Sequence, residues 1–146
     1  MGIGKQAKTL KNKQLDAILA YLKTTRYPLR NKVIFLLSFK AGLRAKEIAS
    51  LTWGMVCDSN GNIASTISLP NCASKGKSGR VIPMHNDLMK ALKDLAAKTD
   101  INSEKRVVRT ERSSIPTPQV IVNFFRNVYR TMGFTGCSSH SGRRTF

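Results

Sequence analysis

The strongest constraint on the fold is a change of hydrophobic period near residue 52 of this 146-residue chain. Before that point, apolar residues recur at the spacing of a buried helical face, which predicts helices over 10–22, 29–41 and 44–51. Short runs of β-prone residues between turn signals follow, and they predict strands over the ranges 52–57, 62–69 and 80–84. Helical spacing then returns over the ranges 86–98 and 117–133.

Turn and capping signals support this division. Asn60-Gly61 is typical of a type I′ turn and predicts a hairpin between the first two strands. Other residues are suited to cap or end the predicted helices: Gly42, Asn86, Thr117 followed by Pro118, and Gly133. Residues 106–108 are a further short strand candidate. The order favours an α+β fold, a mostly helical domain with a small three-stranded antiparallel sheet.

Charge is the strongest global signal for function. The chain has 25 Lys and Arg against 8 Asp and Glu, a formal net charge of +17. The basic residues cluster over 5–13, 75–80 and 105–112. Because so much charge of one sign costs self-repulsion, a polyanionic partner is expected, and nucleic acid is the commonest one. A basic nucleic-acid-binding module without enzymatic activity would explain the charge equally well.

Membrane and secretory classes are not favoured. The longest apolar run, 33–37, is far shorter than the roughly 20 residues of a membrane span. No apolar signal core follows the basic N-terminus, so a cytoplasmic protein is expected. The length fits one domain, with residues 1–9 as a basic lead-in.

Neither a metal nor a nucleotide cofactor is expected. Cys137 and His140 form a C-x-x-H pair, but no second close pair completes a zinc site. Residues 71–78 partly imitate a phosphate-binding loop, yet Asn71 replaces the first glycine and a strand follows in place of a helix. The three cysteines are odd in number and widely spaced, which argues against a disulfide framework.

Three separated basic motifs could together hold one phosphodiester. Arg44 follows the second apolar helix, and a basic turn with Lys75 and Lys77 leads into the third strand at Arg80. The third motif is Ser138-Ser139-His140-Ser141-Gly142-Arg143-Arg144. Arginine presents a fixed fork of donors that matches phosphate oxygens, so this set is suited to stabilising a pentavalent phosphate without a metal.

These motifs resemble those of the tyrosine recombinases, the phage integrases and their relatives. The first arginine box of that family is similar to Gly42-Leu43-Arg44-x-x-Glu47-Ile48-x-x-Leu51-x-Trp53. The family's β-hairpin lysine segment resembles Ser74-Lys75-Gly76 followed by Arg80-Val81-Ile82-Pro83, and its second box resembles His140-Ser141-Gly142-Arg143-Arg144. The resemblance covers roughly residues 10–146 and implies the fold of the DNA breaking-rejoining enzymes.

The resemblance also implies roles for the residues that match. Arg44 and Arg143 would hold the non-bridging oxygens of the scissile phosphate, and His140 would bind the phosphate and assist proton transfer. Lys75 would be the general acid for the leaving 5′ oxygen, with Lys77 as the competing candidate. Glu47 would help to organise the site. The residues expected to bind DNA around it are Lys77, Arg80 and Arg144.

The family's nucleophilic tyrosine has no counterpart in this sequence. The three tyrosines, Tyr21, Tyr27 and Tyr129, all precede His140 and do not match its context. Residues 10–146 are therefore expected to be a partial catalytic domain that lacks the C-terminal nucleophile segment. The complete protein would cut and rejoin double-stranded DNA through a 3′-phosphotyrosine, with further protomers and without metal or ATP. The chain alone is expected to bind DNA without cleaving it.

Overall fold

The computed structural model describes residues 12–70, 79–110 and 115–134, and these residues form a mostly helical α+β fold. Three helices come first and a single helical turn follows them: α1 (Asn12–Leu22), α2 (Pro28–Ala41), α3 (Ala45–Ser50) and α4 (Trp53–Val56). A two-stranded sheet and two longer helices complete the order: β1 (Thr66–Leu69), β2 (Arg80–Pro83), α5 (Asn86–Ala97) and α6 (Pro118–Met132). The predicted fold class is confirmed. Each of the five predicted helices is also confirmed, and its predicted ends lie within one or two residues of the described ends.

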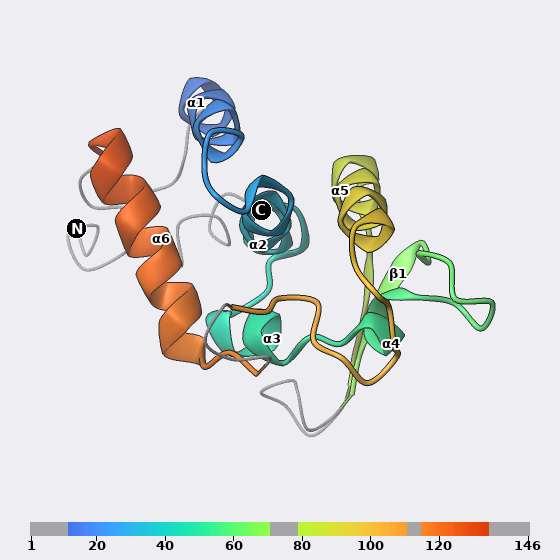
Figure 1. Cartoon of the computed structure of the whole chain (residues 1–146). Coiled ribbons are helices and arrows are strands. Elements are labelled where there is room, and N and C mark those ends of the chain that lie inside the picture. The colour runs from blue at the N-terminus through green and yellow to red at the C-terminus, as the bar shows by residue number, and fades with distance from the viewer. Residues whose placement is uncertain (1–11, 71–78, 111–114, 135–146) are drawn as a thin grey trace, which may run out of the picture.

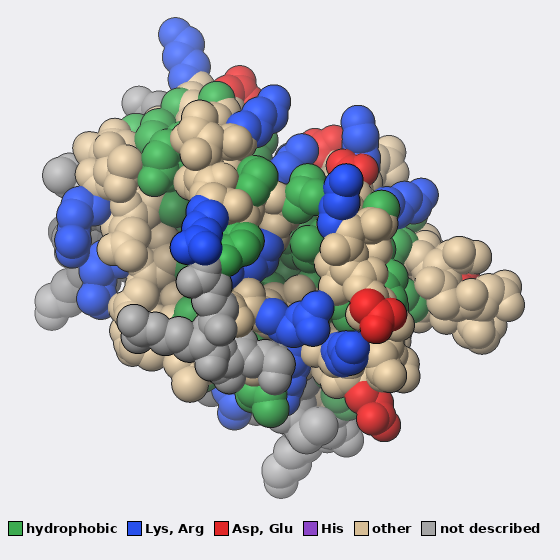
Figure 2. Space-filling model, in the orientation of Figure 1, with side chains coloured by type: hydrophobic (Ala, Val, Ile, Leu, Met, Phe, Trp, Pro, Cys, Tyr) green, Lys and Arg blue, Asp and Glu red, His purple; other side chains and the backbone are tan. Residues whose placement is uncertain are grey.

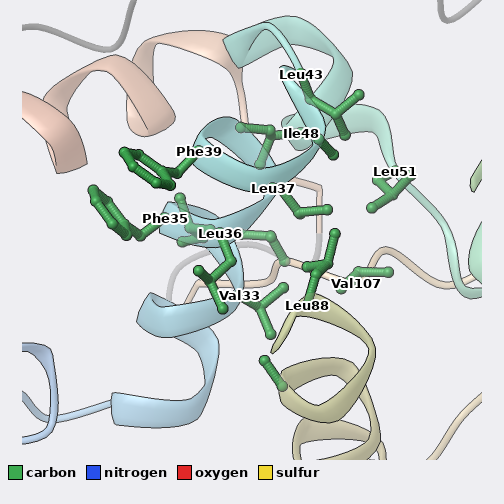
Figure 3. Packing of buried hydrophobic residues seen from close by; sticks show 14 of the residues in the cluster. Val33, Phe35, Leu36, Leu37, Phe39, Leu43, Ile48, Leu51, Leu88 and Val107 are labelled. Atoms are coloured by element: carbon green, nitrogen blue, oxygen red, sulfur yellow. The ribbon is translucent and has the colours of Figure 1, made fainter. Parts of the chain in front are cut away.

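Helix α2 forms the centre of the hydrophobic core. Figure 1 shows it between α5 on one side and α1 and α6 on the other, with α3 close to its end. Its residues 33–39 are all buried, so the helix is covered on every side. Close by, Leu88 of α5 and Val107 lie against the buried side chains of α2 (Figure 3). Residues 33–39 are apolar except for Ser38, and a helical segment that is apolar on all sides is stable in a small domain only when it is surrounded in this way.

The described sheet has two strands, whereas the sequence predicts three. β1 and β2 pair antiparallel, with Thr66 opposite Pro83 and Leu69 opposite Arg80. The predicted strand over 52–57 is wrong, because residues 53–56 form the helical turn α4. Among the described residues, isolated bridges flank this turn, from Thr52 to Arg106 and from Cys57 to Ile63.

Contacts far along the chain explain this difference. The backbone amides of Trp53 and Gly54 donate to the carbonyls of Lys105 and Ser103, both at 3.0 Å. These bonds take up amides that a third strand would otherwise offer to its neighbour. A propensity estimated from residues 52–57 alone cannot include such partners.

The turn at Asn60-Gly61 also differs from the prediction. A type I′ turn needs a positive φ at both central residues. Gly61 has a φ of +81°, but among the described residues only glycines adopt positive values, so Asn60 does not. Instead, one carboxylate oxygen of Asp58 accepts from the amides of Asn60 at 2.9 Å and Asn62 at 3.0 Å. The side chain of Asp58 therefore organises a longer turn.

Most helix ends follow their local signals. Gly42 and Gly133 end α2 and α6 with φ values of 69° and 75°, as predicted. Thr117 caps α6, with Pro118 in the first turn. The predicted cap at Asn86 is wrong by one residue, because His85 accepts through Nδ1 from the amide of Asp87 at 3.1 Å.

None of the helices in the described ranges is long and apolar enough to cross a membrane.

Candidate functional site

Arg44 lies at the junction between α2 and α3. The chain leaves α2 through the left-handed Gly42, and Leu43 then donates its amide to the carbonyl of Leu37 at 3.1 Å. Leu43 is buried, so its side chain anchors the junction in the core. Arg44 follows as the N-cap of α3 with extended backbone angles, φ −78° and ψ 159°. The position of Arg44 is thus fixed from both sides by local backbone geometry.

Glu47, in the first turn of α3, is the most deeply buried charged side chain among the described residues, with 1% exposure. Its Oε1 atom accepts from the backbone amide of Arg44 at 2.8 Å. Its Oε2 atom accepts from Nη2 of Arg80 at 2.5 Å. A buried carboxylate is tolerated only when it is paired, and here both of its oxygens have partners.

Arg80 is the first residue of β2, opposite Leu69 of β1. Its side chain is 39% exposed. Its Nε atom, however, is buried and makes no hydrogen bond to any described residue. The edge of the guanidinium that carries Nε and Nη2 is therefore directed towards Glu47 and the protein interior. Both residues lie in the predicted motifs, but nothing in the sequence indicates that they pair.

Arg44 itself keeps its guanidinium available. Within the described ranges, the structure records no hydrogen bond or ion pair of this side chain, and Arg44 is half-buried. Among the predicted site residues, the structure thus brings together Arg44, Glu47 and Arg80. The other predicted site residues lie outside the described residues: Lys75, Lys77, His140, Arg143 and Arg144.

A second basic group lies on the segment that follows α5. Lys105, Arg106 and Arg109 surround a shallow hollow of about 290 Å³ together with Glu104 and Ile115. The segment is held beside the end of α3 by a bond from the amide of Val107 to the carbonyl of Leu51, at 2.9 Å. Figure 2 shows Lys and Arg side chains around a hollow near the middle of the visible face. The described part of the basic cluster, residues 105–109, is thus tied to the end of α3, the helix that Arg44 caps.

Arg30 helps to fix this basic segment. Its Nη1 atom donates to the carbonyl of Arg109 at 3.1 Å, and its guanidinium lies 4.6 Å from the centre of the Tyr27 ring. Nε and Nη2 donate to Oδ1 of Asn31, which is itself buried. Arg30 therefore has a structural role, and sequence reasoning did not single it out.

The described residues offer few groups for other chemistry. No three His, Cys, Asp or Glu residues among them are close enough to hold a metal ion. Burial raises the pKa of the Cys57 thiol, and the nearby Asp58 raises it further. A thiol with a raised pKa is a poor nucleophile near neutral pH.

Comparison with known proteins identifies the family. The sequence model of the phage integrase family matches residues 8–146. The chain belongs to the phage integrase family. The resemblance to tyrosine recombinases is thereby confirmed, over almost the whole chain. No curated protein is similar enough in sequence to be matched.

Solved structures share the fold of this phage integrase family chain. The XerA recombinase aligns with a TM-score of 0.72 and 20% identity, over 95% of this chain and 48% of its own. XerH bound to a palindromic difH substrate aligns at 0.70 and 17%, over 94% and 40%. A lambda integrase dimer bound to a core site aligns at 0.68 and 15%, over 94% and 39%. The chain thus spans less than half the length of these structures, and identities this low show the fold alone.

Proposed function

We propose that this chain is part of the catalytic domain of a site-specific tyrosine recombinase and that it binds double-stranded DNA. The observation that carries the proposal is the placement of Arg44 in the family fold. Its backbone is fixed by a buried carboxylate, while its guanidinium has no described partner. A guanidinium fork with free donors, carried by a backbone that is held in place, is suited to hold two oxygens of one phosphate.

The proposed reaction is transfer of a DNA phosphodiester to a tyrosine. A tyrosine hydroxyl gives its proton to a base and its oxygen attacks phosphorus. The bond to the 5′ oxygen breaks, and that oxygen receives a proton and leaves as a hydroxyl. Arg44 and Arg143 stabilise the charge on the non-bridging oxygens, since donors aimed at the charge that develops lower the barrier to reaction. His140 supports the phosphate, and Lys75 or Lys77 supplies the proton.

Tyr27 and Tyr129 are poorly placed to be the nucleophile, and Tyr21 is partly buried against the core. Tyr129 is 1% exposed, packed against Phe125 in α6. The ring of Tyr27 lies under Arg30 and close to Arg26. We therefore propose that the nucleophile belongs to a segment outside residues 1–146 and that further protomers complete the reaction. The net charge and the basic hollow at 105–109 support binding to DNA. We propose that the protein acts in the cytoplasm.

The salt dependence of DNA binding tests this proposal. If about five phosphates are neutralised, the logarithm of the association constant falls with the logarithm of salt concentration with a slope near −4 to −5. Binding to a random duplex of about 30 base pairs is measured by fluorescence anisotropy over a series of salt concentrations. Arg44→Gln is expected to make the slope less steep by about 0.9, the loss of one phosphate contact.

Lys93→Gln is the matched control, because it removes the same charge from an exposed position on α5. We expect this variant to change the slope by much less than Arg44→Gln. Salt-independent binding, or the same small change in both variants, would contradict a phosphate contact by Arg44.

A further inference from the structure

The carboxylate of Glu47 connects two arginines that come from different elements. Arg44 precedes α3, and Arg80 begins β2, 33 residues after Glu47. Each oxygen of Glu47 has one of them as its donor, the backbone amide of Arg44 at 2.8 Å and Nη2 of Arg80 at 2.5 Å. Whatever moves the carboxylate therefore moves the hydrogen bond that holds Arg44.

The backbone of Arg80 is itself held rigidly. β2 pairs with β1 in a fixed register, with Ile82 opposite Ile67 and Arg80 opposite Leu69. Ile67 and Leu69 are both buried in the core. A one-residue slip of this register would direct these side chains to the other face of the sheet, so the register is strongly specified. Arg80 thus reaches Glu47 from an anchored strand.

The geometry leaves Arg80 poorly placed to grip a phosphate. Bidentate recognition through the side of a guanidinium uses the donors on Nε and Nη2. Nη2 is bound to Glu47, and Nε is buried. The negative charge of Glu47 also offsets the positive charge of Arg80, whereas Arg44 gives that carboxylate only its backbone amide.

We infer that Arg80 is a positioning residue, which acts through Glu47 to hold Arg44, and not a phosphate contact. Without Arg80, the carboxylate would be buried with one partner and would turn towards water, because an unpaired buried charge is costly. The amide of Arg44 would then lose its acceptor. The inference rests on the proposed function only for the claim that Arg44 binds a phosphate. The link between Arg80, Glu47 and Arg44 does not depend on the proposed function.

Two measurements on the 146-residue chain test the inference. The first is amide hydrogen exchange at Arg44, followed by NMR without DNA. Arg80→Gln is expected to speed this exchange about tenfold, the effect of losing one charge-assisted hydrogen bond. Arg80→Lys is expected to speed it only about threefold, because an ammonium still pairs with the carboxylate but lacks the fork. The amides of α6 should be unchanged in both variants.

The second measurement is the salt slope of binding to a random duplex. Arg80→Gln is expected to change the slope by clearly less than Arg44→Gln, which makes it less steep by about 0.9, because the guanidinium of Arg44 is still present although its backbone is held less firmly. The inference is overturned if Arg80→Gln lowers the slope as much as Arg44→Gln does. It is also overturned if the amide of Arg44 exchanges as slowly in Arg80→Gln and Arg80→Lys as in the unchanged chain. If Arg80→Gln does not fold, the exchange rate in Arg80→Lys decides by itself.

The two proposals can fail separately. If the chain does not bind DNA, or if Arg44→Gln leaves the slope unchanged, the proposed function is wrong. The exchange rate of Arg44 still reports on the positioning role in that case, since it is measured without DNA.

Discussion

Arg44 and Arg80 show how two residues of the same type take different roles through their surroundings. Arg44 contributes its backbone amide to Glu47 and keeps its guanidinium, whereas Arg80 commits its guanidinium to the same carboxylate. Sequence motifs predicted that both residues belong to the site. The motifs could not separate the roles, because the pairing joins residues 33 positions apart and depends on the strand register.

Gly54 is a second residue whose importance depends on a distant neighbour. A Cβ atom at this position would lie 2.9 Å from the carbonyl oxygen of Ser103, closer than real contacts allow. Because the neighbour is backbone, relief requires the segment that carries Lys105 and Arg106 to shift. Small size at position 54 therefore lets the segment that precedes these basic residues approach α4.

We expect Gly54→Ala to lower the free energy of unfolding by about 1–3 kcal/mol, the usual cost of overpacking. Urea denaturation followed by circular dichroism measures the change. Asn127→Ala, at an exposed position on α6, serves as the control and should stay within about 0.5 kcal/mol of the unchanged chain. Equal stability of the Gly54→Ala variant would show that the approach to Ser103 is not needed.

At the level of elements, local signals predicted the helices well and the sheet less well. The helices were predicted because the residues of each apolar face, and the cap of each helix, lie close together in the sequence, as in α5 and α6. Residues 52–57 were wrongly predicted as a strand. The carbonyls of Ser103 and Lys105 that bind the amides of this segment lie about 50 positions along the chain, so a local propensity does not include them. The basic cluster was visible in the sequence, but its position beside α3 was not.

Helix α2 should carry the largest share of the packing energy. Leu36 in its middle is 1% exposed. We expect Leu36→Ala to cost about 2–5 kcal/mol, since it removes buried methyl groups and leaves a cavity. Val120→Ala on α6 truncates a side chain that is 38% exposed and should cost less than about 1 kcal/mol. Similar urea midpoints for the two variants would contradict a core centred on α2.

At the level of the whole molecule, a strongly basic chain carries sequence motifs of its family. The family and the fold class agree with the sequence motifs, and Glu47 accepts from the backbone amide of Arg44. The roles of Lys75, His140 and Arg143 remain predictions. The nucleophilic tyrosine outside residues 1–146 is also a prediction. Each depends on residues outside the described ranges, so a measurement of DNA cleavage is the appropriate test.

The most direct measurement uses the protein with its natural downstream sequence and a phosphorothiolate suicide substrate. The central claim predicts a protein–DNA adduct that survives denaturation. Arg44→Ala should slow its formation by about 10²–10³-fold, the usual effect of removing a transition-state donor, with little loss of DNA affinity. Lys93→Ala should change neither quantity. An unchanged rate in Arg44→Ala, or an adduct formed by residues 1–146 alone and abolished by Tyr129→Phe, would contradict the claim.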